Sequence, residues 1–213
     1  MIDSYRHKGL RRRLVETVLR KGIKDKRILD AIEKVPRHFF MDSGFVEFAY
    51  KDQAFPIGSG QTISQPYTVA FQTEVLNVQK HDKILEVGTG SGYQCVILLE
   101  LGAKVYTIER QRELYLKSRT LLTKMGYKPY FFYGDGYKGL PNHAPFDKII
   151  ITAGAPEIPK ELLKQLKIGG RMIIPVGGKN GQVMITVDRI EEEKFEKTEH
   201  GAFSFVPMLK GKQ

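Results

Sequence analysis

The chain has 213 residues, of which 41% are hydrophobic and 27% are charged, and its formal net charge at pH 7 is +10. This composition suits one sizeable hydrophobic core, and it excludes a membrane-spanning helix because no apolar run approaches roughly 18–20 residues. The single cysteine, Cys95, excludes an intrachain disulfide and favours a reducing, cytoplasmic location.

The N-terminal part of the chain predicts two amphipathic helices. Apolar residues recur at helical spacing over residues 4–21 and again over 25–35, where Pro36 ends the second pattern. Residues 37–60 look irregular, with a short helix near Ser43–Ala49. No apolar stretch follows the basic N-terminus, so we expect no secretory signal. Much of the positive charge lies in these helices, and we expect a solvated helical face and no nucleic-acid partner, because no RNP-type motif or zinc finger accompanies it.

Short apolar strands alternate with helices from about residue 66 onward, a pattern typical of βαβ units and a mostly parallel sheet. We expect an α/β fold of Rossmann-like type, with a mostly parallel seven-stranded sheet flanked by helices and with an N-terminal helical annex formed by the two amphipathic helices. One domain, residues 1–213, is expected, in which a helical and active-site segment, 1–65, precedes a Rossmann-like core, 66–213, that ends in antiparallel strands. The predicted helices are 66–78, 93–102, 112–126 and 159–166, and the predicted strands are 83–88, 104–109, 129–135, 146–154, 170–177, 181–190 and 195–205.

Cysteine and histidine give no sign of nucleophilic or metal chemistry. Cys95 lies inside an apolar helical pattern and is expected to be a buried core thiol. The histidines are scattered, and we expect separate surface or turn residues and no metal site. The aromatic residues of "PYFFY", residues 129–133, are expected in the core, with the alternative that one of them flanks the adenine. The histidines are His7, His38, His81, His143 and His200.

The segment "ILEVGTGSGYQ", residues 84–94, is the sharpest local signal. Glycines at a strand-to-helix turn let the backbone approach a ligand, with a helix N-terminus behind it. Position 93 is tyrosine where a dinucleotide fingerprint needs glycine, and no Gly-Lys-Ser/Thr follows, so that fingerprint and a P-loop are both excluded.

GxGxG preceded by an acid resembles motif I of the S-adenosylmethionine-dependent methyltransferases. The resemblance implies that the chain binds S-adenosylmethionine and releases S-adenosylhomocysteine. In "YTIER", Glu109 stands where the second-strand acid of an α/β nucleotide site binds ribose hydroxyls. In "YGDG", Asp135 and Gly136 stand where such enzymes hold the adenine. The remaining implied cofactor residues are Glu86, Gly88, Thr89, Gly90, Ser91 and Gly92.

The uncharged segment "IGSGQTISQPY", residues 57–67, raises the question of the methyl acceptor. A carboxylate is already ionised near neutral pH, so it needs desolvation and alignment but no general base. Neutral hydroxyls and amides suit such an acceptor without demanding it. Taken alone, the segment also fits a polar Ω-type loop.

The longer stretch "FPIGSGQTISQPYTVA" resembles the signature of the protein-L-isoaspartate (D-aspartate) O-methyltransferases, and the likeness extends from Val35 to Gly211. It implies an enzyme that methylates the free carboxylate of L-isoaspartyl residues in damaged proteins and peptides, with D-aspartyl residues left open. The ester then allows ring closure to a succinimide, whose hydrolysis returns some normal aspartyl linkage. We expect a monomer that acts on these partners.

The resemblance also implies roles by position. Ser64 is the active-site hydroxyl and is expected to align the substrate carboxylate. The chain departs from the family at Ser204, where many members have arginine, and at Met208, where they have leucine. These departures leave the contacts at the substrate's edge open. The implied substrate-binding residues are Thr62, Ile63, Gln65, Val206 and Pro207.

Two other functions account for part of the sequence. A methyltransferase for RNA or a small molecule would suit the positive charge, but a base-directed enzyme usually carries an NPPY-type tetrapeptide or a reactive cysteine after "KIIITAG", and neither is present. A non-catalytic S-adenosylmethionine sensor or peptide-binding module predicts a degraded glycine loop or a missing "TIS" segment, and both are intact.

Overall fold

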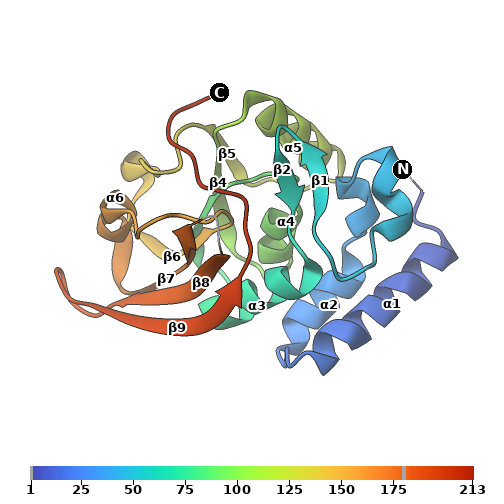
Figure 1. The fold of residues 1–213 in the computed structure, drawn as a ribbon, viewed down its shortest axis with the longest axis horizontal. Helices are drawn as coiled ribbons and strands as arrows, with labels where there is room; N and C mark the ends of the chain where they lie inside the picture. Colours follow the sequence, from blue (N-terminus) through green and yellow to red (C-terminus); the bar gives the residue numbers. More distant parts are fainter. Residues whose placement is uncertain (1, 179–180) are drawn as a thin grey trace.

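The structure, a computed structural model, describes residues 2–178 and 181–213. Its centre is a seven-stranded sheet in the order β5-β4-β3-β6-β7-β8-β9 (Figure 1). Strands β5, β4, β3, β6 and β7 run parallel, and β8 and β9 add two antiparallel partners. The bounds are β3 (Lys83–Val87), β4 (Lys104–Glu109), β5 (Tyr130–Tyr133), β6 (Phe146–Ile151), β7 (Leu166–Gly178), β8 (Gly181–Arg189) and β9 (Phe195–Phe203).

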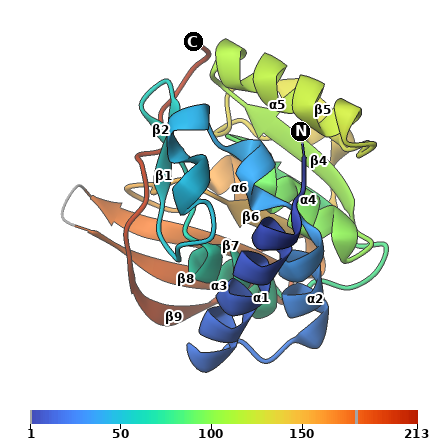
Figure 2. The ribbon, with the colours of Figure 1, turned by 90° about the vertical axis from the view of Figure 1, so that its right-hand side faces the viewer.

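Helices cover the sheet and build the N-terminal annex. Helices α1 and α2 lie side by side, and α2 also packs on α3 and α4 (Figure 2). No helix among the described residues is long and apolar enough to cross a membrane. The helices are α1 (Tyr5–Arg20), α2 (Lys26–Lys34), α3 (Pro66–Leu76), α4 (Tyr93–Glu100), α5 (Arg112–Lys124) and α6 (Lys160–Lys164), with 3-10 turns η1 (Arg37–Phe40), η2 (Ser43–Phe48) and η3 (Pro141–His143).

Strand alternation divides the core into two layers. Successive side chains of a strand point to opposite faces, so Ile84 joins one apolar cluster and Leu85 joins the other. The first cluster contains buried residues of α1 to α5, and the second contains Leu162 of α6 together with Met208. The parallel strands are therefore covered on both faces, which explains why they read as continuous apolar runs.

The order of the strands fixes where a ligand can bind. Strand β3 lies between β4 and β6, so the chain leaves β3 toward one side of the sheet and later returns to the other. Connections that diverge in this way leave a crevice at the carboxyl ends of the strands. The glycine loop follows β3 at this point.

One element of the site was not predicted. Within the irregular-looking region the structure has a hairpin of β1 (Phe55–Gly58) and β2 (Gln61–Ile63). Ser59 and Gly60 at its turn have φ values of 49° and 66°, as a two-residue hairpin turn requires. Strands of three or four residues are too short for a clear alternation, so no periodic pattern predicted the pairing.

Two expectations about aromatic and histidine residues are wrong. Strand β5 is the edge of the sheet and Tyr130 is 53% exposed, so the "PYFFY" aromatics are not all in the core. His38 is buried, and its ring lies 3.9 Å from that of His7, centroid to centroid. Residues 31 positions apart in the chain meet because α1 folds back beside the segment that follows α2. Cys95 is buried, as expected.

Candidate active site

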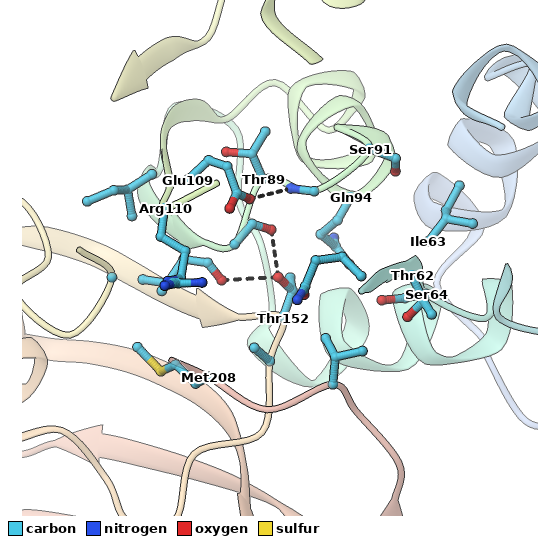
Figure 3. A pocket seen from close by; sticks show the side chains of 18 of the residues that line it. Thr62, Ile63, Ser64, Thr89, Ser91, Gln94, Glu109, Arg110, Thr152 and Met208 are labelled. Atoms are coloured by element: carbon cyan, nitrogen blue, oxygen red, sulfur yellow. Dashed lines mark hydrogen bonds between the residues drawn. The ribbon is translucent and has the colours of Figure 1, made fainter. Parts of the chain in front are cut away.

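A cavity lies at the carboxyl ends of β3, β4 and β6 (Figure 3). Its walls come from the glycine loop, the β2–α3 connection, the end of β4, the segment after β6 and the C-terminal segment. Figure 3 shows Glu109 and Thr89 on one side, Thr62 and Ser64 on the other, and Thr152 between them.

The glycine loop turns tightly because its glycines adopt backbone angles that other residues avoid. Gly88, Gly90 and Gly92 have φ values of 98°, 53° and 86°. A Cβ on Gly88 would lie 2.5 Å from Oγ1 of Thr152, whose hydroxyl donates to the carbonyl oxygens of Val87 and Gly88. Gly92 is the N-cap of α4, so the start of that helix is close to the cavity. A Cβ on Gly92 would lie 2.6 Å from Cδ1 of Leu122, so the loop is too closely packed for a side chain at Gly88 or at Gly92.

Glu109 ends β4 and lies on the cavity wall with its carboxylate buried. One oxygen accepts from the backbone N–H of Gly90 at 2.9 Å, and the other accepts from that of Gln111 at 2.9 Å. Each oxygen keeps a further lone pair, so the carboxylate can accept from two neighbouring hydroxyls. This geometry fits the ribose role that the sequence implied.

Glu86 was expected among the cofactor-binding residues, but it does not line the cavity. It is fully buried on β3, where its Oε2 accepts from the hydroxyl of Thr107 at 2.6 Å. Thr107 is also hydrogen-bonded to Thr89 of the glycine loop, so Glu86 supports the loop from beneath. Burial raises the pKa of Glu86 to about 8, because desolvation outweighs the hydrogen bonds from Thr107 and Cys95.

This raised pKa predicts a pH dependence of stability. Between the ordinary pKa of 4.5 and about 8, the unfolded chain releases the Glu86 proton while the folded chain keeps it. The unfolded state then binds fewer protons, so the free energy of unfolding falls as pH rises through this window. Glu86→Gln removes the titration and should make the decline between pH 5 and 8 shallower, as measured by urea unfolding at pH 5, 6.5 and 8. Parallel curves for the two proteins would contradict it.

The two residues expected at the adenine are placed differently. Gly136 lines the cavity, and a Cβ there would lie 2.5 Å from Cγ1 of Val87. Asp135 does not line it, because its carboxylate accepts from the backbone N–H groups of Tyr137 and Gly211, each at 2.9 Å. In this structure Asp135 therefore holds the C-terminal segment over the cavity.

The substrate-side residues lie where the cavity meets a second hollow, a groove of about 980 Å³. Ser64 and Thr62 line both hollows, and so do Thr152 and Val206. No hydrogen bond joins the Ser64 hydroxyl to another residue in the described ranges 2–178 and 181–213. Of the other predicted residues, Ile63 and Pro207 line only the cavity and Gln65 only the groove.

Asp52 is a supporting residue that the sequence reasoning missed. Its carboxylate accepts from Nε2 of Gln65 at 3.0 Å and from the backbone N–H of Tyr67 at 2.8 Å, and it pairs with Nζ of Lys21 at 2.5 Å. It thus caps the start of α3, which has no side-chain cap of its own, and fixes the residue after Ser64. Thr152 was missed as well, because a threonine at a strand end has no distinctive pattern.

A cluster of possible metal ligands lies outside the cavity, at the N-terminal end of α1. Ligand atoms of Asp3, His7 and His38 lie within 4.8 Å of one another, a spacing that metal sites share. Both oxygens of Asp3 accept from the guanidinium of Arg11, and the ring nitrogens of His38 are hydrogen-bonded to Tyr50 and the Ile2 carbonyl. An adjacent guanidinium disfavours a metal cation, so we assign the group to the packing of α1.

Comparison with known proteins identifies the family. The family model described as protein-L-isoaspartate (D-aspartate) O-methyltransferase matches residues 10–213. The chain belongs to this family. The protein-L-isoaspartate O-methyltransferase of Christiangramia forsetii is 60% identical over the full length of both chains, and that of Flavobacterium psychrophilum is 59% identical over the same extent.

Solved structures agree on the fold. A protein-L-isoaspartate O-methyltransferase superposes with a TM-score of 0.84 at 26% identity, covering 92% of this chain and 65% of that one. A Plasmodium falciparum protein in complex with S-adenosyl-L-homocysteine gives 0.82 at 24% identity, covering 94% and 99%. The family, the α/β methyltransferase fold and the enzyme class expected from the sequence are confirmed, and the chain is an S-adenosylmethionine-dependent methyltransferase of isoaspartyl residues.

Proposed function

We propose that Ser64 aligns the isoaspartyl carboxylate for methyl transfer at the opening between the cavity and the groove. The observation that carries this proposal is that Thr62, Ser64, Thr152 and Val206 line both hollows. A methyl donor held in the cavity and a peptide held in the groove would therefore meet at this opening. The free hydroxyl of Ser64 is available to donate to a carboxylate oxygen.

The residues present fit S-adenosylmethionine, which supplies an electrophilic methyl group on a positively charged sulfonium. Glu109 would accept from the ribose hydroxyls, and Gly88, Gly90 and Gly136 line the cavity without side chains, so the ligand could approach the backbone closely there. The four residues of the opening are uncharged, so they neither repel nor neutralise the carboxylate acceptor. That acceptor is ionised near neutral pH, and alignment and exclusion of water are what the protein must add.

The proposal is tested with two peptides that differ only in one residue, isoaspartyl in one and aspartyl in the other. Each is incubated with the protein and methyl-labelled S-adenosylmethionine, and base-labile methyl ester is counted. We expect label on the isoaspartyl peptide alone. Equal labelling of both peptides would show that the groove does not distinguish the two linkages and would overturn the assignment of the opening.

Glu109→Ala tests the cofactor side. The variant loses the acceptor for the ribose hydroxyls and the anchor of Gly90, so the dissociation constant for S-adenosylhomocysteine should rise by about 10- to 100-fold, equivalent to about 1.4–2.8 kcal/mol. Titration calorimetry measures this directly. Glu113→Ala is the control, since Glu113 is exposed on α5 and accepts from Ser59 at the hairpin tip. An unchanged constant for Glu109→Ala would remove the ribose role.

We also propose that the protein is a cytoplasmic monomer without a nucleic-acid partner. The basic N-terminal helices support the absence of a nucleic-acid partner, because several of their cations are already paired with carboxylates. Light scattering after size exclusion gives the oligomeric state, and a filter-binding assay with total RNA tests the alternative. The pairs are Arg11–Asp3, Arg12–Glu33, Lys21–Asp52, Arg27–Asp25 and Lys34–Glu100.

A further inference from the structure

The groove beyond Ser64 has an aromatic floor. Phe71 of α3 lies at its centre, with the ring of Phe203 at 5.0 Å, that of Tyr67 at 6.0 Å and that of His200 at 6.1 Å, measured between centroids. All four residues line the groove and are only partly buried. Aromatic rings left half exposed in a concave surface are suited to receive another apolar side chain.

The floor carries little free charge. The described residues that line the groove include no carboxylate, and their basic groups are Lys21 and His200. Lys21 pairs with Asp52 and has its Nζ 5.3 Å from the Tyr67 ring. Burial lowers the pKa of His200, which favours its neutral ring, and that ring is hydrogen-bonded to the hydroxyl of Thr186 at 2.9 Å.

The floor is continuous with the opening. Tyr67 and Phe71 lie three and seven residues after Ser64, and α3 begins at Pro66. The helix rises about 7.5 Å from Pro66 to Phe71 and the two residues before it add at most about 7 Å, so the centre of the floor lies within roughly 14 Å of Ser64. An extended peptide covers that distance in at most about four residues, at about 3.3–3.6 Å each. Ser204, which also lines the groove, has a small side chain beside Phe203.

We propose that Tyr67, Phe71, His200 and Phe203 form a subsite for an aromatic or large apolar side chain of the substrate, two or three residues from the isoaspartyl residue. The inference rests on the proposed position of Ser64. It makes the sequence around the damaged residue, and not the isoaspartyl linkage alone, a determinant of which proteins this enzyme methylates.

The test is a scan of isoaspartyl peptides that carry phenylalanine, glycine, lysine or aspartate at each position from three before to three after the isoaspartyl residue. We expect phenylalanine at one position, two or three residues away, to lower KM about 5- to 10-fold relative to glycine with kcat nearly unchanged, as burying one aromatic side chain would give. A KM that is insensitive to the flanking residue, with all peptides methylated, would overturn the subsite but leave the proposed function intact. Methylation of no peptide would overturn the proposed function itself.

Variants locate the effect. Phe203→Ala and the milder Phe71→Leu should each reduce the advantage of phenylalanine over glycine to less than about twofold, while KM for the glycine peptide stays nearly constant. Phe132→Ala is the control, because Phe132 is also half-buried but lies on β5, outside the groove. Binding of S-adenosylhomocysteine confirms that each variant is folded. A preference for phenylalanine that survives both groove variants would contradict the proposal.

Discussion

Replacing Ser64 with alanine is expected to lower kcat on an isoaspartyl peptide by about 10- to 100-fold, while the dissociation constant for S-adenosylmethionine changes less than about twofold. The hydroxyl lies at the opening between the two hollows and is not committed to another described residue, so its loss removes a donor to the acceptor carboxylate. Since the uncharged site offers no general base, alignment is the main contribution that this residue can make.

Single-turnover rates with saturating cofactor measure the effect on transfer, and calorimetry measures cofactor binding. Ser59→Ala is the matched control, because its hydroxyl lies at the turn of the β1–β2 hairpin, which directly precedes Ser64, and donates to Glu113 at 3.0 Å. Equal losses in transfer rate and cofactor affinity for Ser64→Ala would place Ser64 on the cofactor instead of the acceptor.

Gly88→Ala should weaken cofactor binding at least as strongly as loss of Glu109, by about 10- to 100-fold, or about 1.4–2.8 kcal/mol. Two effects combine at this position. The φ of 98° is strained for alanine, and the added Cβ would lie 2.5 Å from Oγ1 of Thr152. The Thr152 hydroxyl is hydrogen-bonded to the carbonyl oxygens of Val87 and Gly88, so relief of the contact requires either loss of these bonds or a shift of the loop.

Gly126→Ala separates the two effects. Gly126 has nearly the same backbone strain, with a φ of 85°, but nothing lies within 4 Å of a Cβ built there. It should lose stability in urea unfolding without losing affinity for S-adenosylhomocysteine. Comparable loss of affinity in both variants would mean that Gly88 acts through global stability and not through the shape of the loop.

The parallel core was predictable because each of its signals is local. A buried strand such as β3 is a continuous apolar run, and Gly88, Gly90 and Gly92 mark the turn that follows it. Glu109 could be placed as well, since it ends the next strand and parallel strands end at the same edge of the sheet. The residues that line the opening came from the family resemblance, and their roles stay predictions until the variants are measured.

What the sequence did not predict depends on contacts between distant segments. Glu86 has the spacing of a ligand-binding acid, but its direction is set by the pleat of β3, which points it at Thr107. Asp135 follows its strand as expected, yet it is committed to Gly211, 76 residues later. The hydrogen bonds from Gln65 and Tyr67 to Asp52 could not be predicted either, because neither helical nor strand periodicity indicates a hydrogen bond across a loop.

The shared opening at Thr62, Ser64, Thr152 and Val206 also bears on the kinetic scheme and on inhibition. In the proposed arrangement, donor and acceptor reach it through separate hollows, and none of the described residues that line it is a cysteine, histidine or lysine that could carry the methyl group in between. Turnover must then pass through a ternary complex, so double-reciprocal plots should intersect and not run parallel. A single compound could also occupy both hollows through the opening, with an adenosine-like group in the cavity and an aromatic peptide group in the groove. Such a bisubstrate ligand would gain affinity from both hollows at once, since binding of its second half becomes intramolecular.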